Sequence, residues 1–439
     1  MVEPADARRA WQQRLAAVAG TFVISMHGPG LHYCFGVLFV QLLKTYGQSR
    51  ALTASVGSIG SGAMMLANAV VGVVQSRRGT QYCVAVGTAL GTVGLLVCAA
   101  ATNIWLVFLG FSIVASVGHA FSFAPCPVCI RRHFRGSARA GLASGVATSG
   151  SGAGAAVFGV LLQWLCTAFG WRVAMLVTAT STAVLLSVSS RGLTDKEEPV
   201  ELSMVTLQRD VASDEPESAT QLAACDTKLG APALAPPTVG WALLRESPLL
   251  GNVCLSYMLL AWGWEIPFVH LARYAIDRGH ADSIPADISL FIGIGGTLGR
   301  ISVSACADYV GARRMVLALM LIMAAANALL PLFIGSLSFL LGFSFVAGTV
   351  SGGIIALQTS LSGFAVSAGT AGRGNTARKN AVLAVASGLV FSMLAPGLIV
   401  GPIVAGAAYD ATEEYAGAFW AAAGCWVMAA VALGPVVVA

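Results

Sequence analysis

Arg300 stands out among the residues that could do chemistry, because it is a cation within a long apolar stretch. Asp308, eight residues later, marks the point where that stretch gives way to a polar loop. At 1.5 Å per residue of helix, Arg300 lies about 12 Å inside the apolar stretch. Burying a guanidinium in hydrocarbon costs on the order of 3 kcal/mol. Such an arginine is therefore expected either to form an ion pair or to bind a substrate. Its planar fork suits a bound carboxylate, and an ion pair with Glu265 or Asp308 is the structural alternative.

Glu265 and three histidines are the other titratable side chains of interest within apolar stretches. Two interpretations of Glu265 stay open. Nearby tryptophans suggest that it reaches a membrane–water interface, where these rings gather, whereas a partly desolvated carboxyl can also serve as a protonatable gate. His27, His32 and His119 can exchange protons near physiological pH, although a lone membrane histidine more often bonds a carbonyl of a neighbouring helix.

The cysteines and motifs of the chain indicate no enzyme. The ten cysteines are scattered, mostly in apolar stretches, where a thiol behaves as a small apolar side chain. Cys126 and Cys129 have the spacing of a redox or metal pair, but no second cysteine pair lies nearby, so packing is the favoured interpretation. No nucleotide-binding glycine loop, zinc motif or nucleophile elbow is present. We therefore expect no catalytic residue, no bound metal and no cofactor.

The composition of the chain excludes a water-soluble globular protein. Of its 439 residues, 56% are hydrophobic and 10% are charged, whereas a soluble domain carries about 25% charged residues. No aspartate or glutamate occurs between Asp6 and Asp195, which is typical of helices surrounded by lipid. The 50 glycines would weaken soluble helices, but they allow membrane helices to pack closely. The elements that carry Arg300 and Glu265 are therefore predicted to be membrane-spanning helices.

Twelve apolar stretches are long enough to cross a bilayer, which takes roughly 20 residues of helix. They cover residues 16–43, 52–74, 81–101, 104–129, 138–165, 171–191, 247–275, 286–307, 313–333, 336–360, 378–405 and 415–437. The predicted fold class is an all-α membrane protein with twelve transmembrane helices in two six-helix bundles. The predicted parts are a polar N-terminus (1–15), a first bundle (16–191), a flexible polar loop (192–246) and a second bundle (247–437).

Lysine and arginine residues give the predicted orientation, because cytosolic loops carry an excess of them. The N-terminus, the 192–246 loop and the other loops on the same side hold 19 of the 25 basic residues. Five lie on the other side, and Arg300 lies within a span. Both termini and the long loop are therefore predicted to be cytosolic.

One segment resembles the signature loop of the major facilitator superfamily. It covers residues 299–314, with the sequence GRISVSACADYVGARR, and joins two predicted spans. Asp308 can accept charge-assisted hydrogen bonds from Arg313 and Arg314, which would form a cytosolic latch that breaks as the bundles rock. The equivalent stretch of the first half, residues 72–79, keeps a basic pair but lacks the aspartate. Its latch should be weaker.

Finer features resemble the monocarboxylate transporter family of that superfamily. They lie in residues 35–39, 46–50, 123–125, 142–147, 266–271, 300, 401–402 and 409–410. The pattern also has departures. A basic residue of the family's first helix falls on Tyr33, and the carboxylate one turn before the eighth-helix arginine falls on Gly296. Because Arg300 is kept, the comparison supports anion recognition better than it supports the family's proton relay.

The resemblance implies a transporter of a small organic anion, in particular a monocarboxylate such as lactate or pyruvate, that works by alternating access. From the chemistry of the residues we expect the substrate against Arg300, with Tyr33 and His32 facing it, and Glu265, His32 and His119 are the candidates for coupling to protons. Proton symport is usual in the family, but the two departures also fit facilitated diffusion. The implied setting is the plasma membrane. The implied partners are the anion, protons and lipid, with room for a single-span accessory subunit and no role for nucleic acid.

Two other function classes stay open. A major facilitator transporter of aromatic, zwitterionic or neutral solutes would share the fold and would not require Arg300. A membrane sensor that transports nothing would act through the 192–246 loop, but this segment has few aromatic residues and no strong motif.

Overall fold

Helices form nearly the whole structure, a computed structural model that describes residues 4–134, 140–193, 240–369 and 376–438. Within these ranges there is no β-strand. A helix satisfies its own backbone hydrogen bonds, as a chain must where lipid offers no partner. Eleven of the described helices are long and apolar enough to cross a membrane, and one bent pair raises the number to twelve. The predicted fold class, an all-α membrane protein with twelve spans, is confirmed.

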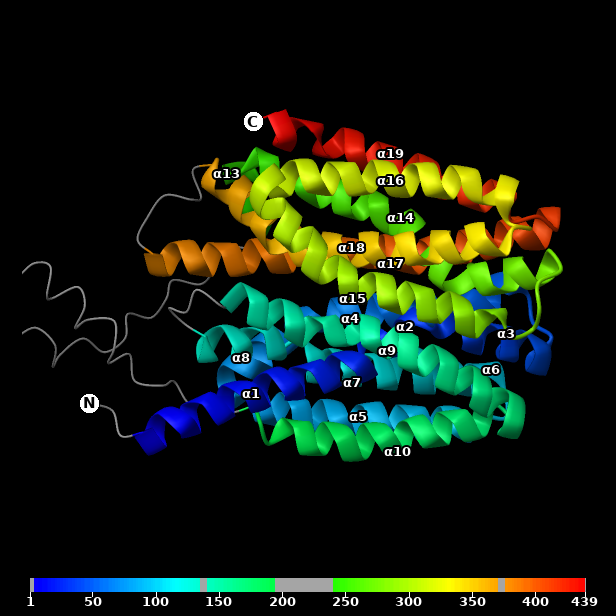
Figure 1. The fold of residues 1–439 in the computed structure, drawn as a ribbon, viewed down its shortest axis with the longest axis horizontal. Helices are drawn as coiled ribbons and strands as arrows, with labels where there is room; N and C mark the ends of the chain where they lie inside the picture. The colour runs from blue at the N-terminus through cyan, green and yellow to red at the C-terminus, as the bar shows by residue number, and fades with distance from the viewer. Residues whose placement is uncertain (1–3, 135–139, 194–239, 370–375, 439) are drawn as a thin grey trace, which may run out of the picture.

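The first half of the chain supplies one set of helices, drawn in blue to green in Figure 1. They are α1 (Pro4–His27), α2 (Pro29–Tyr33), α3 (Phe35–Tyr46), α4 (Arg50–Arg78), α5 (Thr80–Ala99), α6 (Ile104–Val107), the π-helical η1 (Phe108–Ala115), α7 (Ser116–Phe123), α8 (Cys126–His133), α9 (Ala140–Phe169) and α10 (Trp171–Ser190). The stretch from α6 to α8 acts as a single span.

The second half supplies the other set of helices. They are α13 (Gly240–Glu246), α14 (Pro248–Asp277), α15 (Ile284–Val310), α16 (Ala312–Phe333), α17 (Leu337–Ser367), α18 (Thr376–Thr412) and α19 (Ala416–Val438). Their inner faces form one continuous apolar core that includes Tyr257, Met320 and Trp426.

The first membrane span is broken, whereas the sequence predicted one helix over residues 16–43. Three helices replace it, and α3 diverges by 47° from the line of α1 and α2. Pro29 begins α2 and has no N–H to continue α1. Cys34 then leaves helical geometry, with φ −101° and ψ 16°. The break matters for function because it sets His32 and Tyr33 on a short helix of their own.

The end of the long polar segment is helical, although residues 192–246 were predicted to be a flexible loop. Residues 240–246 form α13, and Leu243 in this helix is 2% exposed within the core of the second half. Burial of this apolar side chain stabilises the packing of α13 on the second bundle. The remainder of the predicted loop, residues 194–239, lies outside the described residues.

Two helix pairs join the halves. In Figure 1 the two bundles lie one above the other, with α9 packed on α15 and α4 packed on α18. The start of α1, the end of α19, α8 and α13 all lie at one end, which we call the terminal end. The tip of α3 and the α14–α15 connection lie at the other, which we call the opposite end.

Glycine allows α5 and α7 to touch along their backbones. A Cβ on Gly118 of α7 would lie 2.8 Å from the Gly87 carbonyl oxygen and 2.9 Å from Gly91 Cα. Gly118→Ala should therefore lower the free energy of unfolding by about 1–3 kcal/mol, since overpacking forces the backbones apart. Thermal unfolding in detergent tests this. Gly434→Ala in α19 is the control, because a Cβ there meets no described atom within 4 Å; equal melting temperatures for the two variants would contradict the prediction.

Candidate functional site

Arg300 lies in α15 where the two bundles meet, and it is 4% exposed. Its Nη1 donates to the carbonyl of Gly296, one turn earlier in the same helix, at 3.1 Å. Its Nε has no hydrogen-bond partner in the described part of the chain. Among the residues that the structure describes, Arg300 forms no ion pair. Of the two ion pairs left open by the sequence, the one with Glu265 is therefore not observed; the one with Asp308 involves a side chain outside the described residues.

Tyr33 and Glu265 complete the polar centre between the bundles. The Tyr33 hydroxyl lies close enough to the Arg300 guanidinium and to the Glu265 carboxyl for both groups to act on it electrostatically. The Tyr33 ring packs on Phe268, with centroids 5.1 Å apart. The contacts bring α2 of the first bundle against α14 and α15 of the second.

Glu265 does not reach a membrane interface, so that interpretation of the sequence is wrong. The residue is 3% exposed, and its Oε1 accepts a hydrogen bond from the Ser61 hydroxyl at 2.7 Å. Ser61 belongs to α4 and Glu265 to α14, so this bond crosses between the bundles. The tryptophan beside Glu265, Trp264, stacks on Trp426 inside the second bundle instead of facing lipid headgroups.

A cavity of about 60 Å³ lies between the bundles at this centre. Its polar lining consists of His32, Tyr33, Ser61 and Glu265. The other walls are mostly apolar and include two methionines, a tryptophan and aliphatic side chains from α17 and α18. A small molecule with one polar end and a hydrocarbon body matches such walls.

The predicted proton-exchange histidines lie in the core of the first bundle. His32 and His119 are 4% and 0% exposed, and their facing ring nitrogens are 3.5 Å apart. His27 is separate in its bonding: it contacts the Val23 carbonyl and the Ser181 hydroxyl. Of the three, His32 alone lines the cavity.

The helices α9 and α15 part just beyond this centre. Gly145, Gly152 and Gly159 recur every seven residues, about two turns, and so share one face of α9. A Cβ on Gly152 or Gly159 would run into Thr297 or Ser289 of α15, whereas a Cβ on Gly145 would meet no described atom within 4 Å. The two helices therefore separate toward the terminal end, starting near the level of the buried arginine.

The three residues of the predicted cytosolic latch have different surroundings. Arg313 donates to the Val436 carbonyl at 3.0 Å and lies over the Phe364 ring at 3.9 Å. Both contacts are within the second bundle. Arg314 is exposed. Asp308 lies in the last turns of α15, and its side chain is outside the described part of the structure, so the latch stays a prediction.

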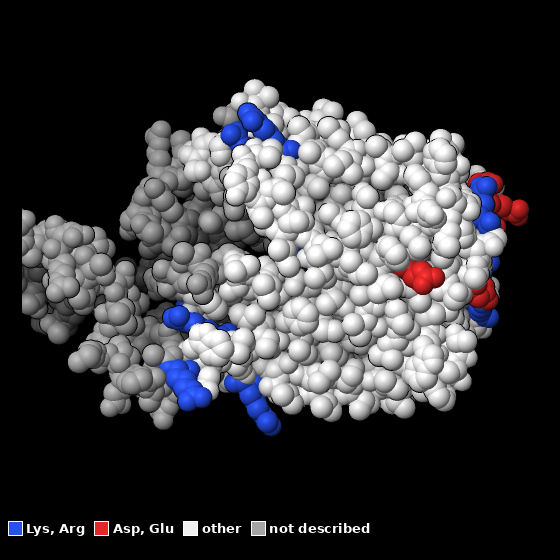
Figure 2. Space-filling model, in the orientation of Figure 1, with Lys and Arg blue, Asp and Glu red and all other residues white. Residues whose placement is uncertain are grey.

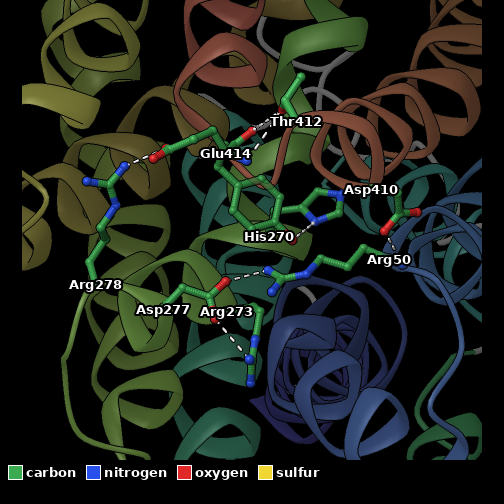
Figure 3. Close-up of polar contacts among 9 residues, drawn as sticks. Arg50, His270, Arg273, Asp277, Arg278, Asp410, Thr412 and Glu414 are labelled. Atoms are coloured by element: carbon green, nitrogen blue, oxygen red, sulfur yellow. Dashed lines mark hydrogen bonds and ion pairs between the residues drawn. The ribbon is translucent and has the colours of Figure 1, made fainter.

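Sequence reasoning missed a polar cluster that joins the bundles at the opposite end (Figure 3). Arg50 of α4 donates through Nη1 to Asp277 of α14 at 2.5 Å, and Asp277 also pairs with Arg273 at 2.9 Å. Asp410 of α18 accepts the backbone N–H groups of Arg50 and the next residue at 2.9 and 3.0 Å. The Arg50 guanidinium lies 3.4 Å from the centroid of the Tyr409 ring. We call Arg50, Asp277, Tyr409 and Asp410 the Arg50 lock. Its one signal in the sequence was that these charges fall at span ends on the same side.

A second, weaker pair lies beside the Arg50 lock. Lys44 of the first bundle donates to Asp282 of the second at 2.8 Å. This hydrogen bond and the lysine charge hold the pKa of the Asp282 carboxyl below its ordinary value. At neutral pH the pair therefore stabilises the contact between the two bundles at the opposite end. This stabilisation is lost as the pH falls through the lowered pKa of Asp282. Both side chains are exposed, so the contribution is small.

The class of protein follows from two comparisons. The family model of the Major Facilitator Superfamily matches residues 21–381. A crystal structure of a mutant of the nucleoside transporter NupG aligns with a TM-score of 0.65 over 97% of this chain and 99% of that chain, at 14% identity. The chain therefore belongs to the major facilitator superfamily of transporters, and the NupG likeness shows the shared fold.

Particular relatives within the superfamily are named monocarboxylate transporters. Monocarboxylate transporter 12 of Xenopus laevis is 25% identical over 95% of this chain and 87% of its own length. Monocarboxylate transporter 11 of Homo sapiens is 26% identical over 95% of this chain and 80% of its own length. Human monocarboxylate transporter 14 is 32% identical, over 36% of this chain and 31% of its own length. The resemblance to this family is thus confirmed.

Proposed function

We propose that this chain carries a small organic anion across a membrane, most simply a monocarboxylate such as lactate or pyruvate. The observation that carries the proposal is Arg300, a buried guanidinium with an unsatisfied Nε and no ion pair among the described residues. A buried cation without a counterion is costly. A carboxylate substrate would supply both the missing charge and the missing acceptor.

The other polar groups suit one end of such a substrate. The hydroxyl of Tyr33 can donate to a carboxylate oxygen beside Arg300, and His32 faces the same cavity. Apolar walls around Met64 and Leu394 would take the hydrocarbon end. Binding would thus depend on charge for anchoring and on burial for the rest.

Transport would proceed by alternating access between the bundles. The Arg50 lock closes the opposite end, while α9 and α15 part toward the terminal end, which fits a carrier open on that side. In the proposed cycle, Asp308 with Arg313 and Arg314 would latch the terminal end when the opposite end opens. Figure 2 shows basic side chains near the terminal end and both signs of charge at the opposite end. With the 19 basic residues counted from the sequence, this favours a cytosolic terminal end. A plasma membrane location is proposed from the likeness to the monocarboxylate transporters alone.

Uptake into proteoliposomes tests the proposal. Radiolabelled lactate, pyruvate and a neutral analogue of similar size would be compared in the wild type, Arg300→Gln and Arg278→Gln. We expect carboxylate uptake in the wild type and a loss of at least about tenfold in Arg300→Gln, because a charge-assisted bidentate contact is removed. Arg278→Gln, which removes an exposed charge from the same bundle, should transport normally.

The outcomes separate the competing functions. Preferred uptake of the neutral analogue, or carboxylate uptake that survives Arg300→Gln, would assign the chain to carriers of aromatic, zwitterionic or neutral solutes. Absence of any transport with any solute would favour a membrane sensor.

A further inference from the structure

His32 of α2 and His119 of α7 form a buried pair in the first bundle. His32 Nε2 lies 3.5 Å from His119 Nδ1 and 3.4 Å from the Ser116 hydroxyl. The rings stand edge to face with centroids 5.6 Å apart. The two outward nitrogens, Nδ1 of His32 and Nε2 of His119, have no hydrogen-bond partner in the described part of the chain.

Two imidazoles in this arrangement can hold one additional proton. In the neutral pair, one of the facing nitrogens carries the hydrogen and the other accepts it, which leaves one outward nitrogen with a free lone pair. A proton added there keeps the shared hydrogen bond and makes it charge-assisted. A second added proton would place two cations against each other and is disfavoured. The geometry thus defines a site for a single proton.

The surroundings of the pair contain few other ionisable groups. The elements packed around it contribute His27 from α1, Tyr33 from α2, Glu265 from α14 and Arg300 from α15. Gly60 of α4, Gly91 of α5 and Phe111 of η1 lie beside the rings. No carboxylate occurs between Asp6 and Asp195. Within the first bundle, histidine is therefore the residue type suited to exchanging a proton near neutral pH.

The position of the pair would couple its proton to the anion. His32 and Tyr33 line the cavity, and the Arg300 charge acts on the Tyr33 hydroxyl. A proton on the pair and the unpaired charge of Arg300 repel each other when the cavity is empty. An anion held by Arg300 removes that repulsion, so each ligand favours binding of the other by the same factor.

We infer that the His32–His119 pair is the proton site of this carrier and is loaded together with the anion held by Arg300. The inference rests on the proposed anion transport. The proton enters and leaves through the cavity at His32, so it crosses the membrane in the same step as the anion. In this arrangement the carrier is a symporter, with its proton in the first bundle and its anion site largely in the second.

Lactate movements in proteoliposomes test the inference. Exchange of radiolabelled lactate at equal pH on both sides measures the carrier itself, and uptake under an inward proton gradient measures coupling. A pH-sensitive dye trapped inside records proton entry when lactate flows in. The variants are His119→Gln and His119→Asn, with His27→Gln as the matched control, because His27 is a buried histidine of the same bundle outside the pair.

In the wild type, we expect the gradient to accelerate uptake on the order of tenfold and lactate entry to acidify the lumen. Both His119 variants should lose the acceleration and the acidification while retaining equal-pH exchange to within about threefold, since the anion contacts remain. His27→Gln should behave as the wild type.

Several results would overturn the inference. Arg300-dependent exchange in the wild type without proton entry would exclude the proton site and leave the proposed anion transport intact. Undiminished acceleration in both His119 variants would place the proton elsewhere, and loss of equal-pH exchange in both would show a structural role for the pair. Absence of lactate exchange in the wild type would instead remove the proposed function and the inference together.

Discussion

Gly296→Asp is expected to make anion uptake steeply dependent on pH. A Cβ at this position would lie 3.7 Å from Arg300 Nη1 and 3.6 Å from both Gly152 Cα and the Gly348 carbonyl oxygen. These are ordinary contacts, so a Cβ fits at this position. The aspartate carboxylate would pair with Arg300 and compete with the substrate. A hydrogen bond to a charged group is worth about 1.5–3 kcal/mol, which corresponds to a loss of about 10- to 150-fold in uptake at alkaline pH.

Acidification should reverse the effect of this substitution. The adjacent guanidinium lowers the pKa of the new carboxyl. As the pH falls through that lowered pKa, the protonated aspartic acid no longer neutralises Arg300, and the arginine becomes available to the anion. Initial rates of lactate uptake at several pH values, equal on both sides of the membrane, would measure the recovery. The wild type lacks this carboxylate, so the variant should show the steeper profile.

Gly296→Asn is the matched control for shape. It has nearly the same volume as aspartate and carries no charge, so uptake should be reduced far less and its pH profile should follow the wild type. If asparagine impaired uptake as strongly as aspartate at every pH, the loss would be steric. The role assigned to the Arg300 charge would then be contradicted.

Arg50→Gln is expected to open the opposite end of the carrier. Arg50 contributes an ion pair to Asp277 and a stacked contact with Tyr409. Its side chain is 13% exposed, so these contacts are better shielded from water than an ordinary surface pair. The Asp410 bonds to backbone N–H groups remain in the variant. A loss of about 2–3 kcal/mol from the closed state would shift the population ratio by roughly 30- to 150-fold.

Distances between spin labels can detect this opening. Labels at exposed positions Gln48 and Glu413 report separation of the two bundles at the opposite end, in a background where the exposed Cys306 is replaced by serine. The Arg50→Gln variant should populate a longer distance that is minor in the wild type.

Arg278→Gln is the control for removal of a charge at the same end. Its partner Glu414 belongs to the same bundle, and both side chains are exposed, so the pair does not hold the bundles together. The distance distribution should stay as in the wild type. An unchanged distribution in Arg50→Gln, or equal shifts in both variants, would show that the Arg50 lock does not govern closure.

The number and type of elements followed from the sequence, because lipid imposes a strong local rule. Each apolar stretch must satisfy its own backbone polar groups, so length and composition alone predict a spanning helix. Two elements were predicted wrongly from composition. α13 was hidden by the polar residues before it, and the first span was predicted as one helix although Pro29 and Cys34 interrupt it.

The depth of Arg300 also followed from the sequence, since position along one helix depends on residue count alone. The neighbours of Arg300 did not follow from the sequence. The sequence left open an ion pair with Glu265 or Asp308, whereas in the fold the Arg300 charge acts on the Tyr33 hydroxyl and Arg300 forms no ion pair among the described residues. Direction around a helix and the identity of its neighbours depend on packing between bundles.

Contacts between distant residues were decided by the tertiary structure. Ser61 and Glu265 are 204 positions apart, and Arg50 and Asp277 are 227 apart. They meet because glycine faces such as that of α9 allow the bundles to approach closely on one side of the centre and part on the other. The sequence by itself determined the spans and the buried charge; the packing of helices determined the cavity, the lock and the partners, since these depend on which faces meet in three dimensions.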